Sequence, residues 1–136
     1  MMTTETMAML DVYPGGLLLG KQLLTRSIET CLECTQAGTA CSDADLGEQM
    51  VADLAKCARL NLDCADMCET TARVLTRQTG YDRDMTRAVV QACAQACRVS
   101  GDECDRHARM HEHCRVCAEV CRRCQRVCEE VLAAIG

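Results

Sequence analysis

The sequence contains no phenylalanine and no tryptophan, and it has only two tyrosines and one proline. Aromatic side chains normally supply much of the buried surface of a core, so the core of this chain must be built from other residues. The first ten residues contain no lysine or arginine, and no apolar run reaches the length of a signal peptide or a membrane span. We therefore expect no export signal, no membrane-spanning segment and a cytoplasmic location.

A basic surface is missing as well. The formal net charge is −5, which gives the chain no general attraction for nucleic acid or for anionic membranes. We expect neither of them as a partner. The length of 136 residues is typical of one domain. We predict a single domain over residues 1–136, in which residues 1–16 form an N-terminal lead that ends at Pro14-Gly15-Gly16.

Cysteine takes the place of the missing aromatic residues and occurs 14 times. Thiols stay reduced in the cytoplasm, so this number of cysteines indicates metal ligands before it indicates disulfides. A thiol that is not ionised also packs as a small hydrophobic group. The candidate ligands are Cys31, Cys34, Cys41, Cys57, Cys64, Cys68, Cys93, Cys97, Cys104, Cys114, Cys117, Cys121, Cys124 and Cys128.

The spacing of the last five cysteines, from Cys114 to Cys128, is typical of a helix with one buried stripe. The intervals are 3, 4, 3 and 4, and a packed helix normally carries Leu or Ile at such positions. All 14 cysteines follow similar stripes, which predict helices over about 17–41, 45–79, 82–107 and 113–135. Because the connections are short, neighbouring helices should be antiparallel. We predict an all-α, up-down-up-down four-helix bundle with a cysteine-lined core.

Turn and capping residues set the predicted boundaries. The stretch from Ser42 to Asp45 is interpreted as a turn, with Asp45 and Glu48 forming a capping box for the second helix. Gly80 should stop that helix, and Asp82 or Asp84 should start the third. Residues 1–14 are expected to form one helical turn or a frayed arm, from which Met7, Met9 and Leu10 could dock on the bundle.

The helical spacing of the cysteines favours metal ions over disulfides within one helix. Residues three or four apart have Cβ atoms roughly 5–6 Å apart, whereas a disulfide needs about 3.5–4.5 Å. Thiolates prefer Cu(I), Zn(II) and iron–sulfur clusters. Several zinc sites with four thiolates each would bury much negative charge, whereas Cu(I) with bridging thiolates leaves the core nearly neutral. We predict many Cu(I) ions per chain; a zinc or iron–sulfur binding module is the alternative.

Three histidines, His107, His111 and His113, lie near the predicted junction of the third and fourth helices. Antiparallel packing brings them to one end of the bundle, whereas the other end carries hydrocarbon side chains such as Leu24 and Ile135. We predict that copper enters and leaves at the histidine end. Because His113 directly precedes Cys114, it is expected to point outward.

Two other polar or flexible residues fall on the predicted stripes. Asn61 lies among the thiols and is interpreted as a hydrogen-bonded core amide. Met50 is interpreted as core filler. Neither is predicted to be a metal ligand.

An enzyme on this scaffold is not expected. Ferritin-like sites need a glutamate three residues before an inward-facing histidine, and none of the three histidines has one. A thiol oxidoreductase would normally place Cys-x-x-Cys in a βαβ unit, and no strand pattern is present. We therefore expect a binding protein.

The run Cys104-x-x-His107, His111, His113-Cys114-x-x-Cys117-x-x-x-Cys121-x-x-Cys124-x-x-x-Cys128 resembles the cytosolic branch of the copper storage proteins. So does the stretch with Cys57, Asn61, Cys64 and Cys68. The resemblance covers nearly all of the chain after about residue 20. It implies a tetramer of four-helix bundles that stores many Cu(I) ions on core thiolates and protects the cell from free copper, with histidines at the open end.

The same resemblance leaves two points open. Copper delivery, with donor or acceptor proteins as partners, is an alternative to bulk storage. The chain also departs from the pattern at Ser27, Gly38 and Ser100, where the stripe has no sulfur. These positions leave the capacity undecided.

Overall fold

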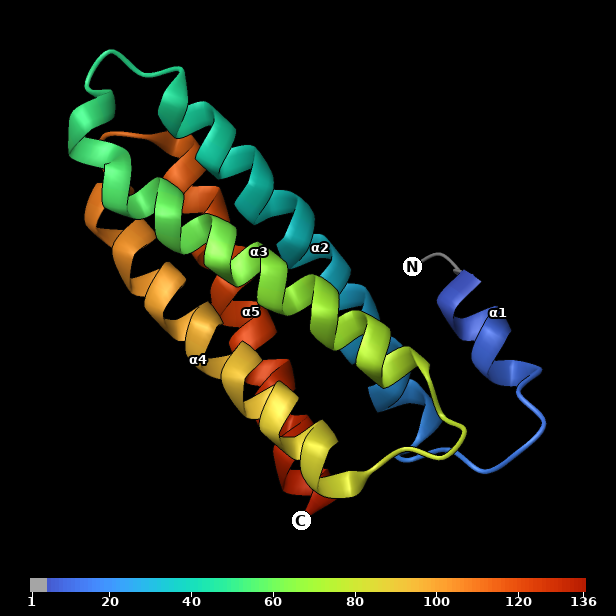
Figure 1. Cartoon of the computed structure of the whole chain (residues 1–136). Coiled ribbons are helices and arrows are strands. Elements are labelled where there is room, and N and C mark those ends of the chain that lie inside the picture. The colour runs from blue at the N-terminus through green and yellow to red at the C-terminus, as the bar shows by residue number, and fades with distance from the viewer. Residues whose placement is uncertain (1–4) are drawn as a thin grey trace.

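The computed structural model describes residues 5–136, which fold into an antiparallel bundle of four long helices (Figure 1). The helices are α1 (Glu5–Asp11), α2 (Lys21–Leu46), the 3-10 helix η1 (Val51–Leu54), α3 (Ala55–Thr76), α4 (Arg83–His107) and α5 (Glu112–Ile135). Each of α2 to α5 packs against two neighbours, in the cyclic order α2, α3, α4, α5. The predicted all-α, up-down-up-down bundle is confirmed. No helix among the described residues is long and apolar enough to span a membrane.

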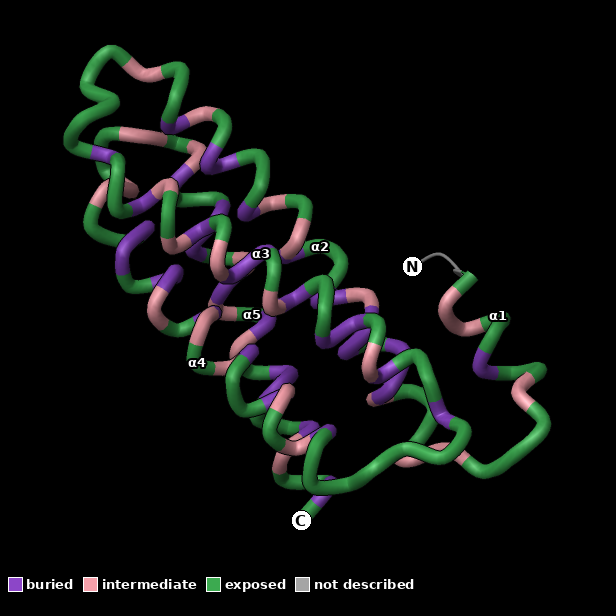
Figure 2. The backbone as a smooth tube through the Cα atoms, in the orientation of Figure 1, coloured by how far each residue is buried: buried purple, intermediate pink, exposed green. Residues whose placement is uncertain are grey.

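Each long helix turns one stripe of side chains inward, and these stripes appear as the buried segments in Figure 2. All 14 cysteines are buried, as their helical spacing predicts, and all 14 are free. The positions without sulfur that interrupt the stripes, Ser27, Gly38 and Ser100, are buried too. Met50 is the exception among the predicted stripe residues: it is 58% exposed, so its assignment to the core was wrong.

Hydrocarbon side chains close one end of the bundle, which we call the hydrocarbon end. It contains Leu24, Leu75, Val90, Val131 and Ile135, all of them buried. The connection between α1 and α2 passes beside this end, where the Leu18 amide donates a hydrogen bond of 2.7 Å to Gln78 Oε1. Burial of this apolar surface contributes to the free energy of folding without any metal.

The N-terminal lead forms a short helix, α1, beside the first part of α2 (Figure 1). Of the three side chains expected to dock, Leu10 is buried and Met9 is 66% exposed, so the expectation for Met9 was wrong. Met7 is partly buried. The part of the lead before Glu5 lies outside the described residues.

The predicted turn at residues 42–45 is wrong, because α2 continues to Leu46. The Ser42 hydroxyl does not cap a helix; it donates a hydrogen bond of 2.8 Å to the Ala58 carbonyl of α3. Asp45 lies in the last turn of α2 and is fully buried, so the predicted capping box with Glu48 does not form. The segment that follows includes η1, and α3 therefore begins at Ala55 instead of near residue 45.

The other boundaries lie closer to the prediction. Asp82 caps α4, with its Oδ1 accepting a hydrogen bond of 2.8 Å from the Met85 amide. Helix α3 ends at Thr76, and Gly80 lies beyond it with φ of 68°, a conformation that glycine adopts without strain. Helix α2 begins at Lys21, four residues later than predicted.

A close approach of α2 to α3 explains why one stripe position has no side chain. A Cβ atom added to Gly38 would lie 2.9 Å from the Asn61 carbonyl oxygen, nearer than ordinary van der Waals contact. A cysteine at this position would push the two helices apart. The absence of sulfur at Gly38 is therefore a consequence of packing.

Candidate metal centre

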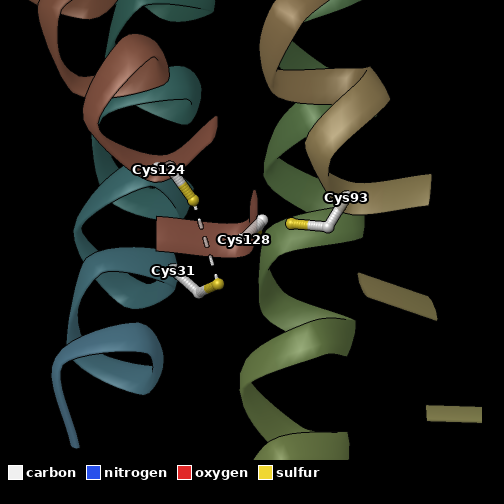
Figure 3. A group of neighbouring side chains, drawn as sticks. All are labelled: Cys31, Cys93, Cys124 and Cys128. Atoms are coloured by element: carbon white, nitrogen blue, oxygen red, sulfur yellow. Dashed lines mark hydrogen bonds between the residues drawn. The ribbon is translucent and has the colours of Figure 1, made fainter. Parts of the chain in front are cut away.

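The first group of sulfurs lies next to the hydrocarbon end. Cys31 of α2, Cys93 of α4, and Cys124 and Cys128 of α5 converge on a common centre (Figure 3). Their four Sγ atoms all lie within 4.8 Å of one another. All four side chains are buried, so the group presents four soft donors in a dry environment.

A second group follows along the axis and shares Cys124 with the first. It consists of Cys34, Cys68, Cys97 and Cys124, one residue from each of the four long helices. The Sγ atoms of Cys68 and Cys97 are 3.7 Å apart, and those of Cys68 and Cys124 are 3.8 Å apart. Because one sulfur belongs to both groups, neighbouring metal ions could share a bridging thiolate.

The line of sulfurs continues through the middle of the bundle to its other end. Cys34, Cys64 and Cys121 form a further group, and the Cys121 and Cys117 Sγ atoms are 4.0 Å apart. Cys117 in turn belongs to a group with Cys41 and Cys104. The thiols thus form a continuous path along the bundle axis.

Asn61 places a buried amide beside this path. Its Oδ1 accepts hydrogen bonds from the Ser100 hydroxyl at 2.8 Å and from the Cys104 thiol at 3.1 Å. Its Nδ2 donates to the Cys57 sulfur at 3.5 Å. The amide is hydrogen-bonded within the core, as predicted from the sequence.

The path ends in a region with nitrogen and oxygen donors, which we call the polar end and define by Cys41, Asp45, Glu48, His111 and His113. The Cys41 sulfur lies 3.4 Å from His113 Nδ1 and 4.0 Å from the Cys114 sulfur. His113 therefore points inward, and the expectation that it points outward was wrong. The sequence contained a signal for this, because His113 lies four residues before Cys117 and so shares its helix face.

Two carboxylates that sequence reasoning did not assign to the site hold the histidines. Glu48 Oε2 lies 3.1 Å from His111 Nδ1 and 2.9 Å from His113 Nε2. Asp45 Oδ1 lies 3.7 Å from His113 Nδ1. Asp45 follows Cys41 by four residues, so the helical spacing could have placed it on the stripe; its resemblance to a helix cap concealed this.

His107 lies at the end of α4, apart from this arrangement of His111 and His113. Its Nε2 atom lies 3.0 Å from Glu103 Oε2, and Glu103 is itself buried. All three predicted histidines thus lie at the end predicted for them, each paired with a carboxylate. Each of their side chains is partly accessible, with His111 the least exposed at 13%.

Hydrogen bonds between thiols shift their proton affinities in opposite directions. The pKa of Cys31 is lowered to about 6, because its thiolate accepts hydrogen bonds from neighbouring thiols, above all from Cys124. The pKa of Cys64 is lowered to about 6 as well, chiefly through Cys121. Cys68 has its pKa raised, mainly by its hydrogen bond with Cys124. The thiolate form, which binds metal, is therefore already favoured at Cys31 and Cys64.

The spacing of the sulfurs suits metal ions and not disulfides. The Sγ atoms of Cys64 and Cys97, and those of Cys68 and Cys97, are 3.7 Å apart, far longer than a disulfide bond of about 2.05 Å. A metal–sulfur bond of about 2.3 Å on each side of an ion would span such a separation. A four-helix bundle with this continuous line of free thiols defines a class of protein that holds soft metal ions along its axis.

The similarities to known proteins agree with that class. The model of the copper storage protein family matches residues 20–133. This chain belongs to the copper storage protein family.

Two solved structures of copper storage proteins from Streptomyces lividans, the first of them named Ccsp, are similar to this chain. The form loaded with ten copper equivalents is 56% identical, with a TM-score of 0.93, over 95% of this chain and 98% of the other. The form with five coppers, described as a cytosolic copper storage protein, is 61% identical, with a TM-score of 0.84, over 85% and 96%. The cysteine-rich protein YhjQ of Bacillus subtilis (strain 168) is 33% identical over 78% of this chain and 93% of its own length.

Proposed function

We propose that this chain stores copper by binding many Cu(I) ions to the thiolates of its 14 core cysteines. The observation that carries the proposal is the continuous line of buried, free sulfurs, in which neighbouring groups share residues such as Cys124. Thiolates that bridge two ions keep the number of ions near the number of thiolates and the core close to neutral. The Streptomyces lividans relative with ten copper equivalents supports a multi-ion store.

The histidines fit a role in copper transfer at the polar end. His107, His111 and His113 are partly accessible, whereas every cysteine is buried. An imidazole outside the bridged thiolate network can bind and release an ion without breaking several metal–sulfur bonds. We propose that copper enters and leaves here, because buried hydrocarbon side chains close the core at the opposite end.

The wider setting of the protein is also part of the proposal. We propose one domain over residues 1–136, a cytoplasmic location like that of the Streptomyces lividans relative, and a homo-oligomer, with the tetramer as the expected form. The chain acts as a store and not as an enzyme. Copper donor or acceptor proteins would meet it at the polar end.

Anaerobic titration of the reduced, metal-free protein with Cu(I), in competition with a Cu(I) chelator, tests the function. Storage predicts saturation at a number of ions on the order of the cysteine count. Saturation at three ions or fewer would contradict it and would favour a delivery protein or a zinc module. A parallel titration with Zn(II) separates those two alternatives.

A matched pair of variants ties the capacity to the sulfurs. Replacing both Cys93 and Cys128 by Ser removes two donors of the group in Figure 3 and should lower the Cu(I) capacity. Thr71→Ser changes a buried side chain but removes no thiol, so it should leave the Cu(I) capacity unchanged. Far-UV circular dichroism of both variants checks that their helices are kept.

A further inference from the structure

Four different donor atoms meet at the polar end, where the core is no longer made of sulfur alone. They are the Cys41 and Cys114 Sγ atoms, His113 Nδ1 and Asp45 Oδ1. The Cys114 sulfur lies 4.0 Å from the Cys41 sulfur, 3.7 Å from His113 Nδ1 and 3.8 Å from Asp45 Oδ1. His113 Nδ1 lies 3.4 Å from the Cys41 sulfur and 3.7 Å from Asp45 Oδ1.

These separations are close to those of a tetrahedral zinc site. Zinc bonds of about 2.3 Å to sulfur and about 2.0–2.2 Å to nitrogen or oxygen place tetrahedral ligands roughly 3.3–3.8 Å apart. Each of the five separations lies within about 0.3 Å of the value that its own pair of atoms requires. The sixth, between Cys41 and Asp45, lies below 4.8 Å. The four donors therefore surround a common point at nearly the separations that a tetrahedral ion requires.

Asp45 gives an independent reason to place a cation here. Its side chain is fully buried, and its Oδ2 atom has no hydrogen-bond partner among the residues that the structure describes. Burying a carboxylate is unfavourable unless a charge or hydrogen bonds compensate for the lost water. A carboxylate is also a poor ligand for the soft Cu(I) ion but an ordinary ligand for zinc.

Glu48 prepares His113 for coordination through Nδ1. Its Oε2 atom lies 2.9 Å from His113 Nε2, so Glu48 accepts the Nε2 proton and, in the neutral ring, the Nδ1 lone pair is directed to the side of the two sulfurs. A histidine that binds metal through one nitrogen commonly donates its other N–H group to a carboxylate. The pattern of ligand and supporting carboxylate is thus complete.

An access route reaches the same residues from the surface. A hollow of about 270 Å³ between α2 and α5 is lined by Gln36, Ala37, Ala40 and Val116 together with Cys41 and His113. A divalent ion could therefore reach the donors from the side of the bundle without passing through the thiol core.

We propose that Cys41, Asp45, His113 and Cys114 form a single tetrahedral site for a divalent cation of the zinc type. Binding of Zn²⁺ releases the two thiol protons to solvent, leaves His113 neutral and gives the site one net negative charge. The site does not depend on the proposed storage function, since it occupies only two of the 14 cysteines. In the presence of copper, Cu(I) competes for those two sulfurs.

Cobalt(II), a spectroscopic probe for zinc sites, tests this proposal in the reduced, metal-free full chain. One equivalent of Co²⁺ should give the strong d–d absorption of a tetrahedral ion with the charge-transfer band of two thiolates, and one equivalent of Zn²⁺ should remove both. Affinities for Zn²⁺ follow from competition with a chromophoric chelator. Asp45→Asn should weaken the first equivalent at least tenfold, and Glu48→Gln should weaken it about tenfold.

Asp43→Asn is the matched control, because Asp43 is exposed on the same helix two residues away, and it should leave the affinity unchanged. His113→Gln gives a second, independent readout: the d–d spectrum should change even if Asp45→Asn alters folding. Three results would each overturn the proposal. They are equal Zn²⁺ affinities of the wild type and Asp45→Asn, a Co²⁺ charge-transfer band of four thiolates, and failure of the wild type to bind one equivalent of Co²⁺ or Zn²⁺. Cu(I) titration of the same samples keeps this outcome separate from copper storage.

Discussion

The core of the bundle ends in fully buried Leu24, Leu75 and Val131 on one side, and in Asp45, Glu48 and His113 on the other. Both ends exclude the central thiols from bulk water, but they do so with opposite chemistry. The hydrocarbon end gains stability from apolar burial and offers an ion no ligand. The polar end buries a carboxylate, which is unfavourable without a compensating charge.

The difference between the ends separates folding from metal binding. At the hydrocarbon end, helices α2 to α5 are held by side chains that need no metal, so the thiols need not be loaded for the bundle to form. At the polar end, thiol, imidazole and carboxylate donors stand close together, which is typical of a functional site. Each of the following predictions tests this division.

The largest effect is expected from a cavity at the hydrocarbon end. Leu24→Ala should lower the free energy of unfolding of the metal-free protein by about 2–5 kcal/mol, because Leu24 is fully buried. Leu46→Ala, at an exposed position near the polar end, should change it by less than about 0.5 kcal/mol. Urea denaturation followed by far-UV circular dichroism measures both. A coil spectrum for the metal-free wild type would contradict the division altogether.

A smaller loss of stability is expected where α2 and α3 approach most closely. Gly38→Ala places a Cβ atom 2.9 Å from the Asn61 carbonyl oxygen, and overpacking of this kind destabilises by about 1–3 kcal/mol. The better helix propensity of alanine offsets up to about 1 kcal/mol, which leaves a net loss of about 1 kcal/mol. Gly16→Ala, with nothing within 4 Å, is the control and should cause no loss. A more stable Gly38→Ala variant would show that the helices can separate freely.

Gly38 also marks a boundary of what the sequence can predict. The stripe positions were predictable, because a period of three and four residues places side chains on one helix face regardless of their partners. Which stripe positions lack sulfur was not explained by that pattern, since the distance between α2 and α3 at Gly38 is set by tertiary packing. The same period predicted the bundle and the burial of every cysteine.

The polar end was harder to predict for a different physical reason. Ser42 and Asp45 have the composition of a turn and a helix cap, and their local preference is real. In the folded chain the Ser42 hydroxyl is satisfied by the Ala58 carbonyl of another helix, and Asp45 is buried against Cys114. Tertiary contacts thus override local signals at the end where the mixed donors gather, and the helix face shared by His113 and Cys117 was the better guide.

Replacing His107 and His111 together by Ala should slow copper loading and removal several-fold, with little change in the final capacity. His111 lies at the polar end and His107 at the adjoining end of α4, both outside the thiol groups, so their loss removes transfer ligands and leaves the sulfurs in place. Stopped-flow mixing with a Cu(I) chelator complex measures the rates. Met110→Ala, 81% exposed in the same connection, is the control. Wild-type rates in the double variant would show that these histidines are not the transfer route.

The smallest effect is expected from an ion pair on the surface of the hydrocarbon end. Arg26 Nη2 lies 2.9 Å from Glu130 Oε1, and both side chains are about half exposed. Exposed pairs of this kind contribute between about 0 and 1 kcal/mol, and salt screens them. Glu130→Gln should therefore lower the free energy of unfolding by less than about 1 kcal/mol, and the difference should shrink at high salt. Urea denaturation at low and high ionic strength measures both quantities. A loss as large as that of Leu24→Ala would mean that charge, and not apolar burial, holds this end of the bundle together.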